Sequence, residues 1–245
     1  MSNVNNAITF NYIGHILSPF KEKFAIPRQP GLVNAAQGKV VLTGDANNAD
    51  LVKELSQFSH IWLLFVFHGT QAQGWNPLVR PPRLGGNKKI GVLATRSTFR
   101  PNPIGMSVVK LLSIEVKNQQ VILHISGLDL LDKTPIVDIK PYVPYSDSLP
   151  EAQAGFAQSQ PAIDLSISFS GNAQLALKKF SEERPELALL IEQVLAQDPR
   201  PAYKQGKDDD KMYGMTLYDL NIEWQMQDLT NILVTDITKH KKSLK

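Results

Sequence analysis

The sequence predicts a mainly β N-terminal domain, built as a barrel or a sandwich, followed by a smaller α+β C-terminal domain. The first half of the chain alternates short apolar stretches with Gly- and Pro-rich loops and holds only one short helical pattern. Residues 141–161 are richer in Pro, Ser, Ala and Gln, which is typical of a linker. Two helical patterns and several strand patterns follow. We therefore expect one domain over residues 8–150 and a second over residues 160–245.

The strands of the first domain are expected over residues 10–16, 39–42, 60–68, 90–94, 107–116, 120–126 and 135–140. Residues 60–68 (HIWLLFVFH) are apolar almost throughout, which favours a strand that is buried on both faces. Residues 117–119 (KNQ) separate two strand patterns and indicate a hairpin. Leucines and a phenylalanine at helical spacing after Asp50 predict a short helix over residues 50–58.

In the second domain, residues 165–169 alternate as a strand, and helices are expected over 172–181 and 185–197. Asn172 is a candidate N-cap of the first helix, and Pro185 suits the first position of the second. After a polar turn at residues 206–211, three strand patterns over 215–220, 222–226 and 232–237 predict an antiparallel meander.

Composition excludes several classes of protein. The 245 residues include no cysteine, which removes disulfides, thiolate catalysis and cysteine–zinc sites. The first twenty residues lack the basic start and apolar stretch of a signal peptide, and the longest strictly apolar run, residues 61–67, is too short to span a membrane. We expect a soluble cytoplasmic protein.

Charge is distributed unevenly along the chain. The net charge is only +3, yet no acidic residue lies between Glu54 and Glu115. An unbalanced positive segment indicates a polyanionic partner, with nucleic acid first, although a solvated basic loop is the alternative. The cations of this segment are Arg80, Arg83, Lys88, Lys89, Arg96, Arg100 and Lys110.

Motifs for several common chemistries are absent from the sequence. No Gly-rich nucleotide-binding motif, no zinc-protease motif and no serine-hydrolase elbow occurs, and we expect no metal. An enzyme of this sequence would depend on positioning and electrostatics.

Three segments carry side chains unusual for plain scaffolding. In residues 27–31 (PRQPG), two prolines and a glycine give a stiff loop that either presents donors to a ligand or serves as a structural turn. In residues 94–107, prolines hold Arg96, Arg100 and Asn102 with little entropy to lose on binding. Residues 129–142 place Asp129, Asp132 and Asp138 beside apolar strand residues. Asp138 is either functional or a structural hydrogen-bond acceptor.

These segments together resemble one family. The motifs SPFKEKF (18–24), PRQPG (27–31), FSHIWLLFVFH (58–68), VRPPRLGGN (79–87), GVLATRSTFRPNPIGMS (91–107), LDLLDKTPIVDIKPY (128–142) and LAQDPRPAY (195–203) stand in the order found in the TrmO family, also called TsaA-like or YaeB. The resemblance runs from about residue 13 to the C-terminal strands. One departure is Phe20, where relatives have Tyr.

The resemblance implies a TsaA-like β-barrel methyltransferase that uses S-adenosylmethionine without a Rossmann domain. It further implies a homodimer that N6-methylates threonylcarbamoyladenosine at position 37, 3′ of the anticodon of threonine tRNA. The cofactor contacts of the family map onto Arg28, Gln29, Pro30, Gly31, Phe67, His68, Arg96, Met106, Asp132, Lys133, Thr134 and Pro135.

Roles within this assignment follow from chemistry. Adenine N6 is a weak nucleophile, so a base is useful, and Asp138 is the first candidate and His68 the second. His68 ends a buried strand and is alternatively a satisfied core histidine. The competing interpretation is a non-catalytic RNA-binding barrel. In either case the expected contacts to the anticodon stem-loop are Arg80, Arg83, Lys88, Lys89, Arg100 and, from the 198–203 loop, Arg200.

Overall fold

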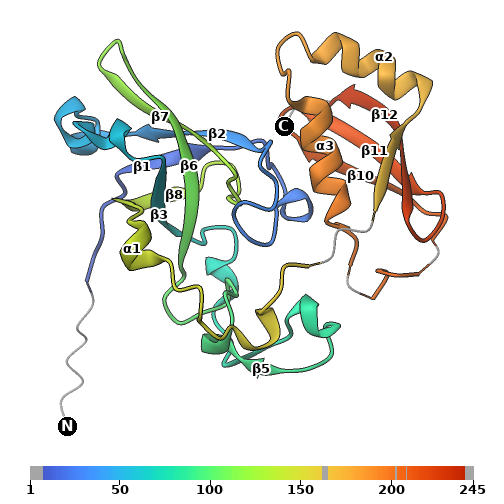
Figure 1. Cartoon of the computed structure of the whole chain (residues 1–245), viewed down its shortest axis with the longest axis horizontal. Coiled ribbons are helices and arrows are strands. Elements are labelled where there is room, and N and C mark those ends of the chain that lie inside the picture. Colours follow the sequence, from blue (N-terminus) through green and yellow to red (C-terminus); the bar gives the residue numbers. More distant parts are fainter. Residues whose placement is uncertain (1–7, 162–164, 202, 208, 241–245) are drawn as a thin grey trace.

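The computed structural model describes residues 8–161, 165–201, 203–207 and 209–240, and Figure 1 shows a β-barrel beside a smaller α+β domain. The barrel is closed by six strands in the order β1-β2-β7-β6-β3-β8, with every neighbouring pair antiparallel. The mainly β prediction is therefore confirmed. The strands are β1 (Gly14–Leu17), β2 (Gln37–Leu42), β3 (His60–Val66), β6 (Ile104–Lys117), β7 (Gln120–Ser126) and β8 (Pro135–Pro141).

Alternation along β3 divides the barrel into an inner and an outer face. Ile61, Leu63 and Phe65 are buried inside, whereas the residues between them are only partly buried. The expectation of a strand buried on both faces is therefore wrong, because the outer face of a closed barrel has no second layer over it here. Large apolar residues consequently remain on the outer wall.

The hairpin between β6 and β7 forms where the sequence predicts it. Lys117 pairs with Gln120, so Asn118 and Gln119 are the two loop residues. Their φ angles of 50° and 63° lie in the left-handed region that a two-residue hairpin loop requires.

The helix expected over residues 50–58 is absent. The segment instead forms 3₁₀ turns at Ala49–Val52 and Leu55–Gln57. Glu54 has a φ of 65°, a left-handed conformation that no α-helix can pass through. Apolar side chains do face the barrel, but they do so from two separate turns, in which Val52 and Leu55 pack against the core.

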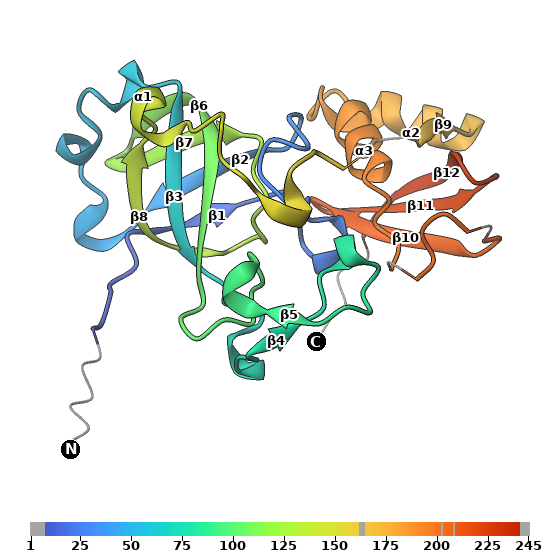
Figure 2. The same ribbon diagram turned by 60° about the horizontal axis from the view of Figure 1, so that its bottom comes forward.

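A long excursion, residues 67–103, leaves β3 and returns into β6. It contains the short pair β4 (Leu78–Val79) and β5 (Ile90–Gly91), so the strand expected over 90–94 shrinks to two residues. A 3₁₀ turn at Val92–Ala94 replaces the rest. Figure 2 shows β4 and β5 projecting from one end of the barrel.

The C-terminal domain follows a linker that contains α1 (Pro144–Asp147). Its sheet has the order β10-β11-β12-β9, and two helices cover one face (Figure 2). The meander of the last three strands is confirmed, while β9 adds in parallel beside β12. The elements are β9 (Ser166–Phe169), α2 (Gly171–Phe180), α3 (Leu187–Ala196), β10 (Met212–Leu217), β11 (Leu220–Met226) and β12 (Asn231–Lys239).

Two helix starts differ from those expected. Ser170, not Asn172, caps α2, because its hydroxyl accepts a hydrogen bond from the Ala173 backbone N–H at 3.1 Å. Helix α3 begins at Leu187, two residues after Pro185.

The two domains share one hydrophobic core. Phe20, which is fully buried, forms a β-bridge with Leu217 of β10, and the Tyr218 N–H donates to the Pro19 carbonyl at 2.7 Å. The Ala35 N–H donates to Gln193 Oε1 on α3 at 2.9 Å. The C-terminal domain is thus bonded to the loops at one end of the barrel.

No helix within the described ranges has the length and apolar character needed to cross a membrane. Among those same residues, no cluster of His, Asp and Glu side chains is suited to hold a metal ion.

Candidate active site

The segments expected to bind a cofactor gather at one end of the barrel. Strand β3 ends at Val66 opposite Ile104, where β6 begins, and β8 begins at Pro135 opposite His15. The 27–31 loop lies at the same end, because the Gly31 N–H donates to the carbonyl of Gly127 just after β7 at 2.9 Å. Antiparallel closure therefore brings together residues up to about a hundred positions apart in the sequence.

Phe67 and His68 leave β3 beside the start of β6. The Phe67 N–H donates to the Pro103 carbonyl at 2.8 Å, and the Phe65 and Phe67 rings meet edge to face at 5.3 Å. A side chain at Gly105 would collide with both rings, so glycine is required for this close approach. The His68 ring forms no hydrogen bond with the part of the chain that the structure describes.

Two of the predicted loops are joined directly by their side chains. Arg96 Nη1 donates to Gln29 Oε1 at 2.6 Å, which links the 27–31 loop to the 94–107 loop. The other guanidinium donors of Arg96 form no hydrogen bond with described residues and could bind an anionic group. Within the same loop, Arg100 donates to the carbonyls of Thr95 and Ser97 and so braces the turn.

Asp129 is a candidate site residue to which the sequence analysis assigned no role. Its Oδ1 accepts a hydrogen bond from the buried Ser107 hydroxyl at 2.6 Å. Burial raises the pKa of Asp129 to about 6, while the Ser107 hydrogen bond and the charge of Arg96 act in the opposite direction. Perturbed carboxyl groups of this kind concentrate at functional sites. Only the fold reveals the pairing, since Ser107 lies on β6 whereas Asp129 lies in the segment between β7 and β8.

Asp132 has internal partners for both carboxylate oxygens. Oδ1 accepts from the Ser18 N–H at 2.9 Å, and Oδ2 forms an ion pair with Lys21 at 2.8 Å. Lys133 follows with a φ of 63°, and the buried Thr134 donates to the Leu131 carbonyl at 2.7 Å. This turn fastens the end of β1 to the start of β8 at Pro135.

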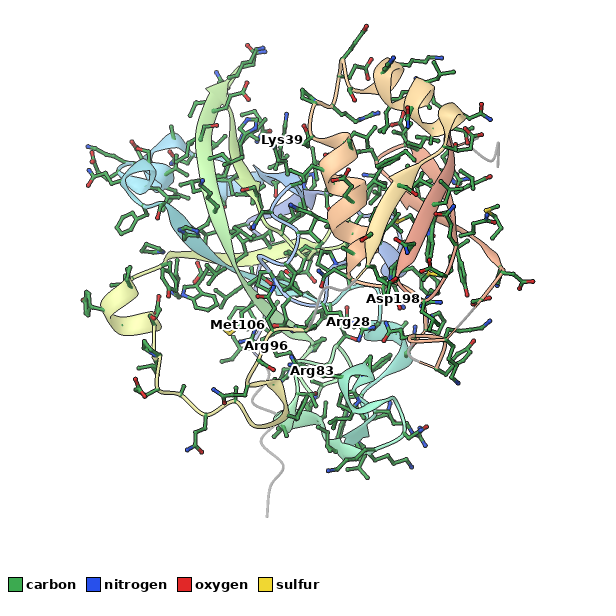
Figure 3. All side chains as sticks on the ribbon, turned by 45° about the vertical axis from the view of Figure 1, so that its right-hand side comes forward. Arg28, Lys39, Arg83, Arg96, Met106 and Asp198 are labelled. Carbon is green, nitrogen blue, oxygen red and sulfur yellow. The ribbon has the colours of Figure 1, made fainter. Side chains whose placement is uncertain are left out.

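Arg28 and Met106 point to different surroundings. The Arg28 side chain lines a pocket between the barrel loops and the C-terminal domain, towards Asp198 (Figure 3). Met106 lies on the outer wall of β6 with 51% of its surface exposed. In Figure 3, Met106, Arg96, Arg28 and Asp198 follow one another from the barrel towards the C-terminal domain.

Asp138 shares the outer wall with Met106. The register pairs Asp138 with Leu64 and Leu64 with Met106, so the three side chains form one row across β8, β3 and β6. The Asp138 carboxylate accepts a hydrogen bond from the backbone N–H of the next residue, Ile139, at 2.9 Å. It also forms an ion pair with Lys140 at 3.1 Å.

The excursion carries the expected cations on its surface. Arg80, Lys88 and Lys89 are exposed and form no ion pair within the described ranges, while Arg83 donates to Ser159 of the linker. Arg200 was expected to contact RNA from the surface, but its side chain is 0% exposed. It binds Asp198 through two parallel hydrogen bonds of 2.8 and 2.9 Å and is therefore structural.

Two family models match this chain. Residues 15–148 match the tRNA-methyltransferase O N-terminal domain, and residues 162–240 match the TrmO C-terminal domain. The chain belongs to the TrmO family. It is 52% identical over 223 residues to the tRNA (adenine(37)-N6)-methyltransferase of Escherichia coli K12, covering 91% of this chain and 95% of that protein.

Other TrmO relatives extend the comparison. A putative S-adenosylmethionine-dependent methyltransferase of Pseudomonas aeruginosa is 46% identical over 226 residues, covering 92% of this chain and 95% of that one. The crystal structure of TrmO from Pseudomonas aeruginosa superposes with a TM-score of 0.80 at 38% identity, covering 95% and 98% of the two chains. The TrmO architecture thus extends over both domains.

Proposed function

We propose that this protein is an S-adenosylmethionine-dependent methyltransferase that methylates N6 of adenine 37 in tRNA. The observation that supports it most is the convergence of Arg96, Gln29 and Asp129 at one end of a TrmO barrel. The finer proposal is that the substrate base is threonylcarbamoyladenosine in threonine tRNA. The protein would act where tRNA is modified, in the cytoplasm.

The chemistry of the barrel end suits the cofactor. S-adenosylmethionine carries a carboxylate, an ammonium group and an adenine, together with a sulfonium that supplies the methyl group. Arg96 has donors left for the carboxylate, and Asp129, ionised at neutral pH, is an acceptor for the ammonium group. Phe67 offers an apolar surface beside them. The turn at Asp132–Pro135 would complete the cradle.

Methyl transfer needs alignment more than acid–base chemistry. Holding donor and acceptor in line at the barrel end would lower much of the barrier, because bound reactants lose no further translational freedom. The adenine N6 proton must also leave. Asp138 remains the first candidate for the base, and His68, with an unengaged ring at the barrel end, is the second.

A second copy of the chain would complete the site. The outer wall of β6 exposes Ile104 (43%), Met106 (51%) and Leu112 (45%), an apolar surface suited to burial in a dimer. Covering it would place the row Met106–Leu64–Asp138 in an interface beside the cofactor residues. We therefore propose a homodimer through this wall.

The excursion would hold the anticodon stem-loop. Arg80, Lys88 and Lys89 form no ion pair with described residues, and they lie on a segment that begins and ends at the candidate site. Cations so placed bind phosphates without reading sequence, which suits docking a folded RNA. The guanidinium of Arg83 would contribute from beside the linker.

Mass spectrometry of tRNA nucleosides tests this function. Cells lacking the protein should lose the N6-methylated form of threonylcarbamoyladenosine, and the purified protein with S-adenosylmethionine should restore it. Parallel assays with unmodified tRNA would show whether the threonylcarbamoyl group is required. Unchanged nucleosides together with no calorimetric binding of S-adenosylmethionine would instead establish a non-catalytic RNA-binding barrel.

A further inference from the structure

A pocket lies between the two domains, next to the barrel end. It has a volume of about 330 Å³, which is within the range of pockets that enclose small ligands. One wall is the loop that carries Phe24, Pro27 and Arg28, and the other is the end of α3 with Gln197 and Pro199. Arg28 neighbours Gln29, which binds Arg96, so the pocket and the candidate active site share one loop.

The far wall of this pocket is rigid. Asp198, with a φ of 46°, reverses the chain directly after α3 and grips Arg200 with both carboxylate oxygens. Gln205 Nε2 donates to the Asp198 carbonyl at 2.7 Å, which closes the loop on itself. A preorganised wall of this kind loses little entropy when a ligand binds.

Three polar side chains of the pocket form no hydrogen bond or ion pair that satisfies them within the described residues. Gln197 Nε2 is buried and has no hydrogen-bond partner in the described structure. A buried donor without a partner costs free energy, and a rotation of the Gln197 amide into the pocket would let an acceptor on a ligand recover it. Lys23 and Arg28 also line the pocket and form no salt bridge with described residues, since Asp198 is engaged by Arg200. Partial removal of Arg28 from water lowers its pKa, and the charge of Asp198 acts the other way.

The apolar groups of the pocket suit a flat ring. Phe24 is 65% exposed at the pocket, and Pro27, Pro82 and Pro199 supply further rigid apolar surface. Unpaired RNA bases stack on exposed aromatic rings and are read through their edges by polar side chains. Lys23 and Arg28, which form no salt bridge with described residues, would place positive charge beside this surface for the phosphates that flank such a base.

We infer that this interdomain pocket takes up one unpaired nucleotide of the bound tRNA, other than the methylated adenosine. This inference rests on the proposed function. The base stacks on Phe24 and accepts a hydrogen bond from Gln197, while Lys23 and Arg28 hold its phosphates. The pocket thereby contributes to choosing the tRNA while the barrel end performs the chemistry.

Steady-state methylation of tRNA tests the inference with Gln197→Leu and Phe24→Ala. Each variant should raise KM for tRNA about 5-fold or more, with kcat and the Kd for S-adenosylmethionine unchanged. The matched control is Phe10→Ala, which removes another exposed aromatic ring outside the pocket and should behave as the unaltered protein. Circular dichroism of each variant checks that the fold is retained.

Several outcomes would overturn the inference. The same KM for tRNA in both pocket variants as in the unaltered protein would overturn it. If the unaltered protein methylates tRNA in that experiment, the proposed function still stands, without a role for the pocket. Titration with adenosine, guanosine, cytidine and uridine monophosphates separates the sources of a nucleotide. Tight binding of a free monophosphate with no change of KM for tRNA would assign the pocket to a free nucleotide instead. Ultraviolet crosslinking of bound tRNA to the peptide that holds Phe24 would support the inference directly.

Discussion

At the scale of single residues, burial of Asp129 makes its ionisation dependent on folding. A carboxyl group has a pKa of about 3.9 in an unfolded chain, and the fold raises that of Asp129 to about 6. The folded state therefore binds the proton more tightly than the unfolded state. By linkage, this residue's contribution to stability is full below about pH 4 and is lost as the pH rises to about 6.

Replacing Asp129 by Asn should remove that pH dependence. Asn keeps an acceptor for the Ser107 hydroxyl without a buried charge, so the variant should gain about 3 kcal/mol relative to the unaltered protein at pH 7. Urea unfolding between pH 4 and 7 measures the difference. Asp45→Asn, at an exposed position, is the control and should leave the curve unchanged. A D129N curve parallel to that of the unaltered protein would refute the assigned cause.

Asp138→Asn distinguishes the two candidate bases. Losing a general base should slow single-turnover methyl transfer about 100-fold or more, while the Kd for S-adenosylmethionine stays the same. Lys140→Gln is the matched control, because it breaks the same ion pair and leaves the carboxylate in place. An undiminished rate in D138N would rule out Asp138 as the general base. His68 would then be the candidate, and H68Q should slow single-turnover methyl transfer.

At the scale of elements, the 80–89 loop between β4 and β5 is expected to contribute to RNA affinity and not to cofactor binding. Replacing Arg80, Lys88 and Lys89 by Gln removes three exposed cations. The slope of log K for tRNA against log salt should fall by about 2 to 3, since each lost phosphate contact contributes just under one. Filter binding from 50 to 300 mM salt measures the slope. Equal slopes for the triple variant and the unaltered protein would place the RNA elsewhere.

Local sequence predicted the elements whose signals are themselves local. Strand β7 and the hairpin that precedes it follow from alternation and from the polar residues 117–119, although Lys117 belongs to β6 and only Asn118 and Gln119 form the loop. The resemblance located the barrel-end segments. The prediction of a helix over 50–58 was wrong because the backbone of Glu54 is left-handed, which interrupts a helix whatever the spacing of the apolar residues. The prediction that Arg200 lies on the surface was wrong. A charged residue in a Pro-rich loop suggests exposure, whereas the ion pair with Asp198 allows this charge to be buried. Asp129 needed tertiary structure, because Ser107 reaches it only through the barrel.

At the scale of the whole molecule, the shared core should make the two domains unfold together. Phe20 is fully buried where the barrel loops meet β10, so Phe20→Ala should cost about 3 to 5 kcal/mol. Fluorescence of Trp62 in the barrel and of Trp224 in the C-terminal sheet, in single-tryptophan variants, should report the same midpoint before and after the change. Two separate midpoints in the unaltered protein would show that the domains are independent.

The closed barrel has a further consequence for how such proteins diversify. Pairing of β3 with β6 anchors the 67–103 excursion, and pairing of β4 with β5 fixes both ends of the 80–89 loop within it, so lengthening that loop adds only about 0.6 kcal/mol of closure entropy for each doubling. A lineage could therefore exchange the loop proposed to meet the nucleic acid while keeping Phe67, His68 and Arg96, which are proposed to hold the methyl donor. New substrate preferences become reachable without passing through an unfolded or inactive ancestor.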